Sequence, residues 1–132
     1  MNDLKLRPLD FGKDYPVVCE WWRAHGWRYI PKEKLSQSGF VVEKNGVPVV
    51  AGWVFVTDSA WRWIDFVVAN PSVIKGKKEA IKLLVTHVRD GCKEAGLELF
   101  TSVENENLIS LYEQTGAIRA DRGMTNMVWR LI

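Results

Sequence analysis

The chain has 132 residues, a length that suits one ordinary domain and is too short for two self-sufficient hydrophobic cores. Apolar residues make up 47% and charged residues 26% of it, a composition that excludes a disordered chain and a fibrous repeat. The formal net charge of +2 is too small to indicate nucleic-acid binding. We therefore expect one domain over residues 1–132 that folds on its own.

Targeting and metal-binding patterns are missing from the sequence. The N-terminus carries charges where a secretory signal needs an apolar stretch, so we expect a cytoplasmic protein. The longest apolar run, residues 49–56, is less than half of the roughly 20 residues that a bilayer span requires, and predicts no membrane role. Cys19 and Cys92 have no Cys or His partners at metal-binding spacing. The pattern predicts neither a disulfide framework nor a metal site.

The first half of the chain predicts strands and one helix. Apolar spacing predicts, in chain order, a strand at 4–9, a helix ending at residue 25, and strands at 40–44, 47–57 and 61–68. Asp14 suits this helix as its cap, and Gly26 suits it as its end. Asn45-Gly46 strongly favours a two-residue hairpin turn between two of the strands. The three later strands are expected to form an antiparallel meander.

The second half predicts a long helix between two strands, and a shorter helix after them. The elements are expected, in order, as a helix at 77–95, a strand at 97–103, a helix at 106–114, a short strand at 117–120 and a closing strand at 125–131. A strand, a helix and a strand in succession are typical of a right-handed parallel crossover. The whole pattern predicts an α/β domain, a mixed sheet with helices on both faces.

A basic loop precedes the long helix. Lys75, Lys77 and Lys78 surround Gly76 at a helix start, where the helix dipole favours acidic residues instead. A phosphate-bearing ligand would explain these lysines, because free backbone amides and ammonium groups together bind anions. The alternative is that they are solvated surface residues, and the loop by itself leaves both interpretations open.

Two segments carry a resemblance to a known family. Residues 75–80 are Lys-Gly-Lys-Lys-Glu-Ala, and residues 105–117 are Asn-Glu-Asn-Leu-Ile-Ser-Leu-Tyr-Glu-Gln-Thr-Gly-Ala. They are similar to the Gln/Arg-x-x-Gly-x-Gly/Ala and Asn-x-x-Ala-x-x-Leu-Tyr-x-x-x-Gly-Phe segments of the GCN5-related N-acetyltransferases (GNATs), which use acetyl-CoA. The resemblance covers mainly residues 61–117. The short chain also looks like the compact members encoded by bacteriophages.

The resemblance implies the GNAT fold, a central mixed sheet of roughly six to seven strands flanked by about four helices. It also implies that backbone amides of the loop hold the CoA pyrophosphate. The positions concerned are Lys75, Gly76, Lys77, Lys78 and Ala80. Lys75 stands where the family has Gln or Arg, and Lys78 stands where it has Gly. A Cβ at Lys78 limits how closely the backbone approaches a phosphate.

The resemblance further assigns the path of the pantetheine arm. The main chain of Phe66, Val67 and Val68 would pair with it, and an N–H there would polarise the thioester carbonyl, while their side chains stay in the core. Asn105 would donate a hydrogen bond to the same arm. The alternative role of Asn105, a cap at the start of the helix, is compatible with that contact.

Two residues are expected to handle protons. By register with the family, Tyr112 would be the general acid that protonates the CoA thiolate, and the alternative is a tyrosine packed on the core with its hydroxyl at the rim. Asp65 is the acid inside the 61–68 strand, which suits it as general base for the amine. Its alternative is a carboxylate paired with Arg62 or a loop lysine. Glu20 is a weaker candidate base.

The acceptor is predicted only by chemical class. Trp21, Trp22 and Trp27 fall where the family builds its acceptor pocket, and an aromatic wall suits an apolar or cationic amine, although core packing is the alternative for each. The leading hypothesis is direct acetyl transfer from acetyl-CoA, without a metal, to a small-molecule or protein amine. A homodimer is compatible with the family. The second hypothesis is a catalytically reduced module with this fold that binds a protein partner.

Overall fold

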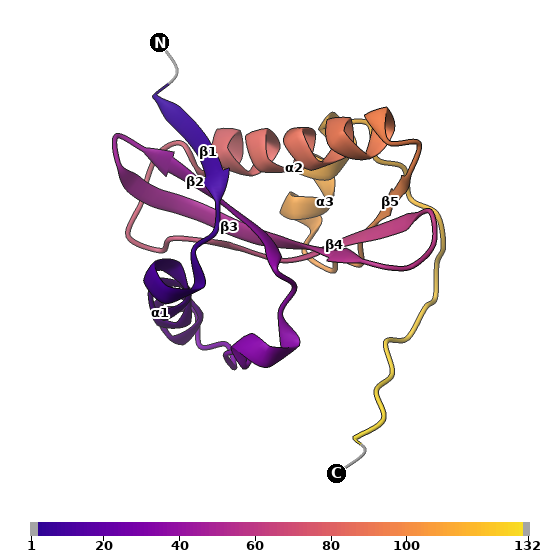
Figure 1. The fold of residues 1–132 in the computed structure, drawn as a ribbon, viewed down its shortest axis with the longest axis horizontal. Coiled ribbons are helices and arrows are strands. Elements are labelled where there is room, and N and C mark those ends of the chain that lie inside the picture. The colour runs from indigo at the N-terminus through magenta and orange to yellow at the C-terminus, as the bar shows by residue number, and fades with distance from the viewer. Residues whose placement is uncertain (1–2, 131–132) are drawn as a thin grey trace.

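The computed structural model describes residues 3–130 and forms one five-stranded sheet with helices on both faces. In chain order the elements are β1 (Leu4–Pro8), α1 (Phe11–Ala24), the 3-10 turn η1 (Lys32–Lys34), β2 (Ser38–Lys44), β3 (Val47–Val56), β4 (Trp61–Ala69), α2 (Lys77–Glu94), β5 (Glu98–Phe100) and α3 (Glu106–Gln114). The strands lie side by side in sequence order, β1 to β4 antiparallel and β5 parallel to β4 (Figure 1). The predicted meander and parallel crossover are confirmed.

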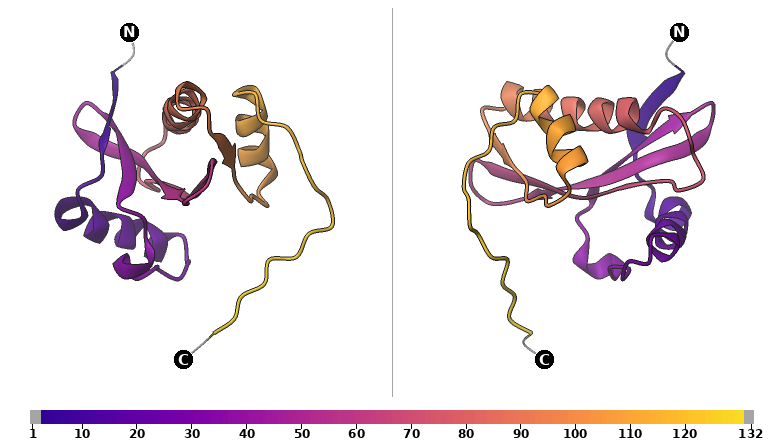
Figure 2. Two further views of the ribbon diagram at one scale, coloured as in Figure 1. Left: turned by 45° about the vertical axis from the view of Figure 1, so that its right-hand side comes forward. Right: turned by 180° about the vertical axis from the view of Figure 1, so that it is seen from behind.

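The two faces of the sheet carry separate hydrophobic clusters. α2 packs on one face, where Leu84 and Ala80 meet Val42, Val50 and other strand residues, and Tyr112 of α3 joins the same cluster. α1 packs on the opposite face and buries Trp53 completely. Figure 2 shows α2 and α3 together on one side of the sheet and α1 on the other. The sheet is therefore the middle layer of three.

The first helix begins earlier than the sequence pattern predicts. Asp10, not Asp14, is its cap, and the Asp10 carboxylate accepts hydrogen bonds from the N–H groups of Gly12 and Lys13. Asp14 lies inside the helix, where its carboxylate forms a two-pronged pair with the Arg7 guanidinium at 2.7 and 2.9 Å. The prediction was wrong because the sequence does not reveal that β1 places Arg7 against this turn.

Fewer strands and helices form than the resemblance implies. Within residues 3–130 the structure has five strands and three α-helices, against the roughly six to seven strands and four helices expected. Residues 117–130 contain no strand, although strands were predicted at 117–120 and 125–131, of which residue 131 lies outside the described residues. This segment leaves the domain as an extended tail (Figure 1), with Met124 and Trp129 exposed. An alternating pattern yields a strand only where a partner edge receives it.

No helix in the described part of the chain has the length and apolar character needed to cross a bilayer. The Asn45-Gly46 turn predicted from sequence is present, with both residues at positive φ, 52° and 79°. The helix at Glu106–Gln114 begins and ends where the pattern placed it. These elements form as predicted because local turn and cap chemistry specifies them.

Candidate functional site

The start of α2 is the one α-helix start among residues 3–130 that no side chain caps. Asp10 caps α1 and Asn105 caps α3, whereas Gly76 at the start of α2 has no side chain to do so. Gly76 adopts φ 92°, a left-handed conformation that disfavours other residues. The first helical hydrogen bond is donated by Ala80 to the Gly76 carbonyl. The N–H groups of Lys77, Lys78 and Glu79 before it have no helical partner.

Positive charge gathers around these free amides. Lys75 and Lys78 are exposed and Lys77 is half-buried, so the loop exposes ammonium groups to solvent. Ala80, one turn into the helix, is buried in the core. Lys44 of β2 adds a fourth ammonium, since its Nζ lies 3.5 Å from the position that a Cβ on Gly76 would take. The arrangement is suited to an anionic group such as a phosphate.

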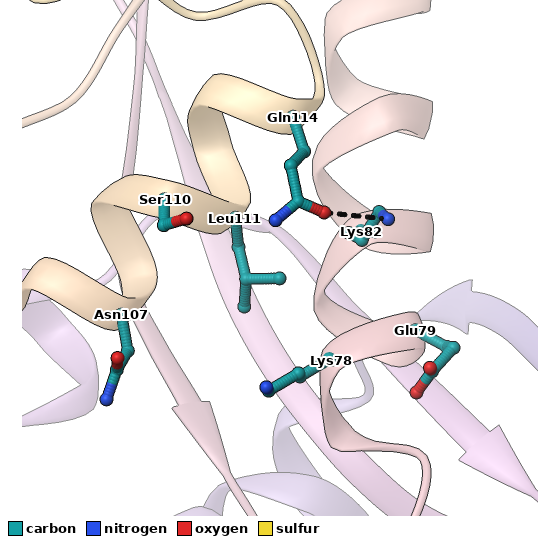
Figure 3. A pocket seen from close by; sticks show the side chains of 7 residues that line it. All are labelled: Lys78, Glu79, Lys82, Asn107, Ser110, Leu111 and Gln114. Atoms are coloured by element: carbon teal, nitrogen blue, oxygen red, sulfur yellow. Dashed lines mark hydrogen bonds between the residues drawn. The ribbon is translucent and has the colours of Figure 1, made fainter.

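A pocket of about 310 Å³ separates α2 from α3 beside this helix start. Its lining combines lysines of α2 with polar residues of α3: Lys78, Glu79, Lys82, Asn107, Ser110, Leu111 and Gln114. Figure 3 shows Lys78 and Leu111 reaching into the space between the two helices, and the Lys82 ammonium donates to Gln114 Oε1 at 3.1 Å across it. The pocket therefore lies beside the basic loop and borders Leu111, the residue before Tyr112.

β4 carries a bulge at the residues predicted to face the cofactor. Trp53 pairs with Asp65 and Ala51 pairs with Val68, so Phe66 and Val67 together oppose a single β3 residue, Gly52. Phe66 has φ 57°, which is unusual for a residue with a side chain. Val67 packs so closely on β3 that a Cβ on Gly52 would lie 3.1 Å from its Cγ2.

β4 and β5 diverge immediately before this bulge. Their parallel pairing covers Trp61–Trp63 against Glu98–Phe100 and then stops. Just after the paired residues, the Thr101 hydroxyl donates a hydrogen bond to the Ile64 carbonyl at 2.7 Å. Within the described residues, the β4 edge from Asp65 to Ala69 therefore has no strand beside it. Two of its peptide groups have other partners, since the Ala69 carbonyl lies 3.0 Å from His25 Nε2 and the Phe66 N–H donates to the Asp65 side chain.

The Asp65 side chain is hydrogen-bonded to the backbone of the bulge and not to a cationic side chain. Its Oδ1 accepts a 2.8 Å hydrogen bond from the N–H of Phe66. The predicted alternative, an ion pair with Arg62 or a loop lysine, is wrong, because Asp65 forms no ion pair within residues 3–130. The Arg62 guanidinium donates instead to the carbonyls of Thr57 and Ser59. The Asp65 side chain is half-buried, and its second oxygen, Oδ2, accepts no hydrogen bond from a described residue.

Tyr112 lies near this carboxylate, in the core at the α3 side. Its side chain is 5% exposed, and burial, reinforced by the Asp65 charge, raises the pKa of Tyr112 well above its ordinary value. Its hydroxyl makes no hydrogen bond with any described residue. Asn105 caps α3, with Oδ1 accepting from the Leu108 N–H at 3.1 Å, and its amide nitrogen has no described partner. Both expected alternatives, core packing for Tyr112 and capping for Asn105, hold in the structure.

The tryptophans of α1 do not form an open wall. Trp21 and Trp22 are buried in the cluster beneath the sheet, with 6% and 3% exposure, so the core-packing alternative holds for both. Trp27 is exposed and stacks on His25 at 4.4 Å between ring centroids. Glu20 is exposed on α1. Helical spacing cannot distinguish a wall from a core face, because both produce the same stripe.

The bulged β4, its divergence from β5 and the uncapped helix start define the fold of the GCN5-related N-acetyltransferases. Solved structures agree: ribosomal-protein-S18-alanine N-acetyltransferase from Escherichia coli matches with a TM-score of 0.70 and 18% identity, over 86% of this chain and 76% of that one. Glucosamine-6-phosphate N-acetyltransferase from Arabidopsis thaliana matches at 0.69 and 18%, over 94% and 97%. N-acetylglutamate synthase from Neisseria gonorrhoeae, solved with coenzyme A and N-acetyl-glutamate, matches at 0.63 and 17%, over 83% and 27%.

No family model and no curated protein sequence matches the chain. The resemblance therefore lies in the fold and in short motifs. Sequence reasoning missed several polar residues of the site. Lys44 and Lys82 lie outside the quoted segments, and Gln114 stands at a position that the family pattern leaves open. The spacing of Lys78 and Lys82, four residues apart on one helix face, is the pattern that would have pointed to the second of them.

Proposed function

We propose that the protein is an acetyl-CoA-dependent N-acetyltransferase that moves the acetyl group directly to an amine. The observation that carries this proposal is that Tyr112, whose hydroxyl has no described hydrogen-bond partner, stands near both an uncapped basic helix start and a bulged strand. Ala80 of that helix shares the core cluster of Tyr112, and the charge of Asp65 at the bulge acts on the Tyr112 hydroxyl. The amides of the helix start and the Tyr112 hydroxyl lack a partner within the described chain, and the β4 edge after Ile64 has no strand beside it. A long ligand with a phosphate end and a thioester end would contact all three. Two aligned structures are named as N-acetyltransferases, and a third, N-acetylglutamate synthase, was solved with coenzyme A and N-acetyl-glutamate.

The loop fits a pyrophosphate in charge and in backbone geometry. Free amides of Lys77, Lys78 and Glu79 would donate to it, and the ammonium groups of Lys75 and Lys44 would offset its charge. The Lys78 side chain points into the pocket between α2 and α3 (Figure 3). Lysine can therefore replace the glycine that the family has here while its backbone N–H still serves the anion.

The bulge would act on the thioester. The Phe66 N–H is available to the carbonyl oxygen once the Asp65 carboxylate leaves it, and such a donor contributes roughly 3 kcal/mol to an acyl-transfer barrier. Release from Phe66 frees Asp65 to take a proton from the attacking amine, directly or through water. Tyr112, kept protonated by its raised pKa, would give its proton to the departing sulfur as the carbon–sulfur bond breaks.

Calorimetric titration with acetyl-CoA tests the cofactor site, with desulfo-CoA and adenosine 3′,5′-bisphosphate as partial ligands. We expect micromolar binding of acetyl-CoA and weaker, measurable binding of the bisphosphate through the loop. Release of free thiol in the presence of an amine panel then tests transfer. No heat at millimolar acetyl-CoA would overturn the proposal.

The second candidate is a binding module that has this fold and has lost catalysis. Two observations favour it: Lys78 carries a Cβ at the glycine position, and the Phe66 N–H is already satisfied by Asp65. This candidate predicts acetyl-CoA binding without thiol release for any amine, and the same pair of measurements distinguishes it from the first.

A further inference from the structure

The face of the sheet opposite α2 is only partly covered. α1 packs on Val41, Ala51 and Trp53 and reaches Val68 near the end of β4. The start of β4 and all of β5 lie beyond it (Figure 1). There Trp61 is 55% exposed and Trp63 36% exposed. Side chains on a strand alternate between faces, and Ile64 and Leu99 belong to the α2 cluster, so their neighbours Trp63 and Phe100 belong to this open face.

Five aromatic rings line this face of the sheet, and we call them the aromatic face: Phe55, Trp61, Trp63, Phe66 and Phe100. Phe55 and Phe66 pack against the α1 cluster, and the other three lie beyond it. Trp63 stacks on Phe100 with 14° between ring planes, and Trp61 lies 4.6 Å from Phe100 between centroids. Phe55 and Phe66 meet edge to face at 5.8 Å. The ring that belongs to Phe66 connects this surface to the bulge, where acetyl transfer is proposed.

The charges on the same face are negative. Asp65 follows Trp63 by two residues, and Glu98 precedes Phe100 by two residues, so both carboxylates share the face with the rings. Among the described residues of β3, β4 and β5, no Lys or Arg belongs to this face, because Arg62 alternates to the other side and borders a pocket beneath α2. An anion would therefore meet two carboxylates here, whereas a cation would meet carboxylates and ring faces.

We propose that the acceptor is a cationic primary amine carried by a flat apolar group, which lies on the aromatic face with its nitrogen beside Asp65. Successive residues on one face of a strand are about 7 Å apart, so a ring on Trp63 and an ammonium at Asp65 suit a short linker between the ring and the nitrogen. The ring faces attract the ammonium ion, and Asp65 takes its proton before attack. This inference rests on the proposed function for its reaction and on the exposed rings for its binding.

Binding can be measured without acetyl-CoA, which separates the two proposals. The seven tryptophan indole N–H groups give seven resolvable NMR signals in uniformly 15N-labelled protein, and W61F and W63F identify two of them. Phenethylamine, phenethyl alcohol and 3-phenylpropionate share one ring and differ in charge. We expect phenethylamine to shift the Trp61 and Trp63 signals at a concentration at least ten times lower than 3-phenylpropionate, with the neutral alcohol between them. The inference is overturned if 3-phenylpropionate binds as well as phenethylamine or better, or if only the signals of other tryptophans shift. This holds whether or not the protein binds acetyl-CoA.

Turnover provides the second measurement. With acetyl-CoA and phenethylamine, Trp63→Ala should raise the KM for the amine about tenfold and leave kcat within about twofold, and Trp63→Phe should stay near the parent because it keeps a ring. Tyr29→Ala removes an exposed aromatic ring outside the aromatic face and is the control. An unchanged amine KM in Trp63→Ala overturns the inference even where acetyl-CoA binds normally.

Discussion

The Asp65 carboxylate accepts a 2.8 Å hydrogen bond from the N–H of Phe66, the residue whose positive φ creates the bulge in β4. Asp65, the predicted general base, thus accepts a hydrogen bond from the Phe66 N–H, the group predicted to polarise the thioester carbonyl. The contact also explains how a phenylalanine stays at φ 57°, since the side chain of the preceding residue satisfies its N–H there. Asp65 and the thioester carbonyl compete for one hydrogen-bond donor.

Asp65→Ala should separate the two roles of this residue. The substitution frees the Phe66 N–H, so acetyl-CoA should bind as tightly as to the parent or more tightly. Turnover should fall by roughly a hundredfold, because loss of a general base costs about that much or more. Calorimetry and initial rates measure the two effects. Weaker acetyl-CoA binding together with unchanged turnover would remove Asp65 from the mechanism.

Tyr112→Phe should lower turnover while acetyl-CoA binding stays within about twofold. The hydroxyl makes no hydrogen bond to a described residue, so its removal should also leave the melting temperature nearly unchanged. Burial and the Asp65 charge raise the pKa of Tyr112, so the hydroxyl remains protonated beyond the ordinary tyrosine value of about 10. Any loss of activity that Tyr112 causes at alkaline pH should appear above that value. Unchanged turnover in Tyr112→Phe would contradict its role as acid.

Replacing Lys75 and Lys77 together by Glu should weaken acetyl-CoA binding by roughly tenfold or more, because acidic side chains would then face the pyrophosphate. Lys13→Glu with Lys34→Glu is the control, since both lysines are exposed and the change in net charge is the same. Titration with adenosine 3′,5′-bisphosphate localises the effect to the phosphate end. Equal affinities in the two double variants would place the phosphates away from this loop.

The Arg7–Asp14 pair should set the acid stability of the domain. Asp14 is nearly inaccessible, with a 3% exposed side chain, and its hydrogen bonds with Arg7 hold its pKa below the ordinary value. A lowered pKa stabilises the fold above the unfolded-state value of about 3.9, and this contribution is lost as the pH falls through the native value. Asp14→Ala should cost about 2 kcal/mol at neutral pH, because it removes the two charged hydrogen bonds from Arg7, although Arg7 keeps its ion pair with Glu43 at 3.2 Å.

Urea unfolding at pH 7 and at pH 3 measures this contribution. The difference between parent and Asp14→Ala should shrink at the lower pH. Asp90→Ala is the control, because its pair with Arg89 is exposed and should contribute little. A difference that stays constant between the two pH values would show that the carboxylate charge is not its source.

The sequence by itself determined the elements whose causes are local. The turn at Asn45-Gly46 forms because two residues that tolerate positive φ stand together, and the Asn105 cap fixes where α3 begins. The helix, loop and tyrosine motifs were also sufficient to predict the fold, since each is a short pattern with a fixed place in it. The basic loop was found in the same way, because its lysines are neighbours in sequence.

Only the tertiary structure decided which side chains are free to act. Trp22 and Trp63 are chemically identical, yet α1 buries the first against the sheet and stops short of the second. The bulge at Phe66 lies opposite Gly52 of β3, and the ion pair of Asp14 joins α1 to Arg7 of β1. These relationships join residues distant in the chain, so their energies depend on how the layers pack, and no local pattern records them.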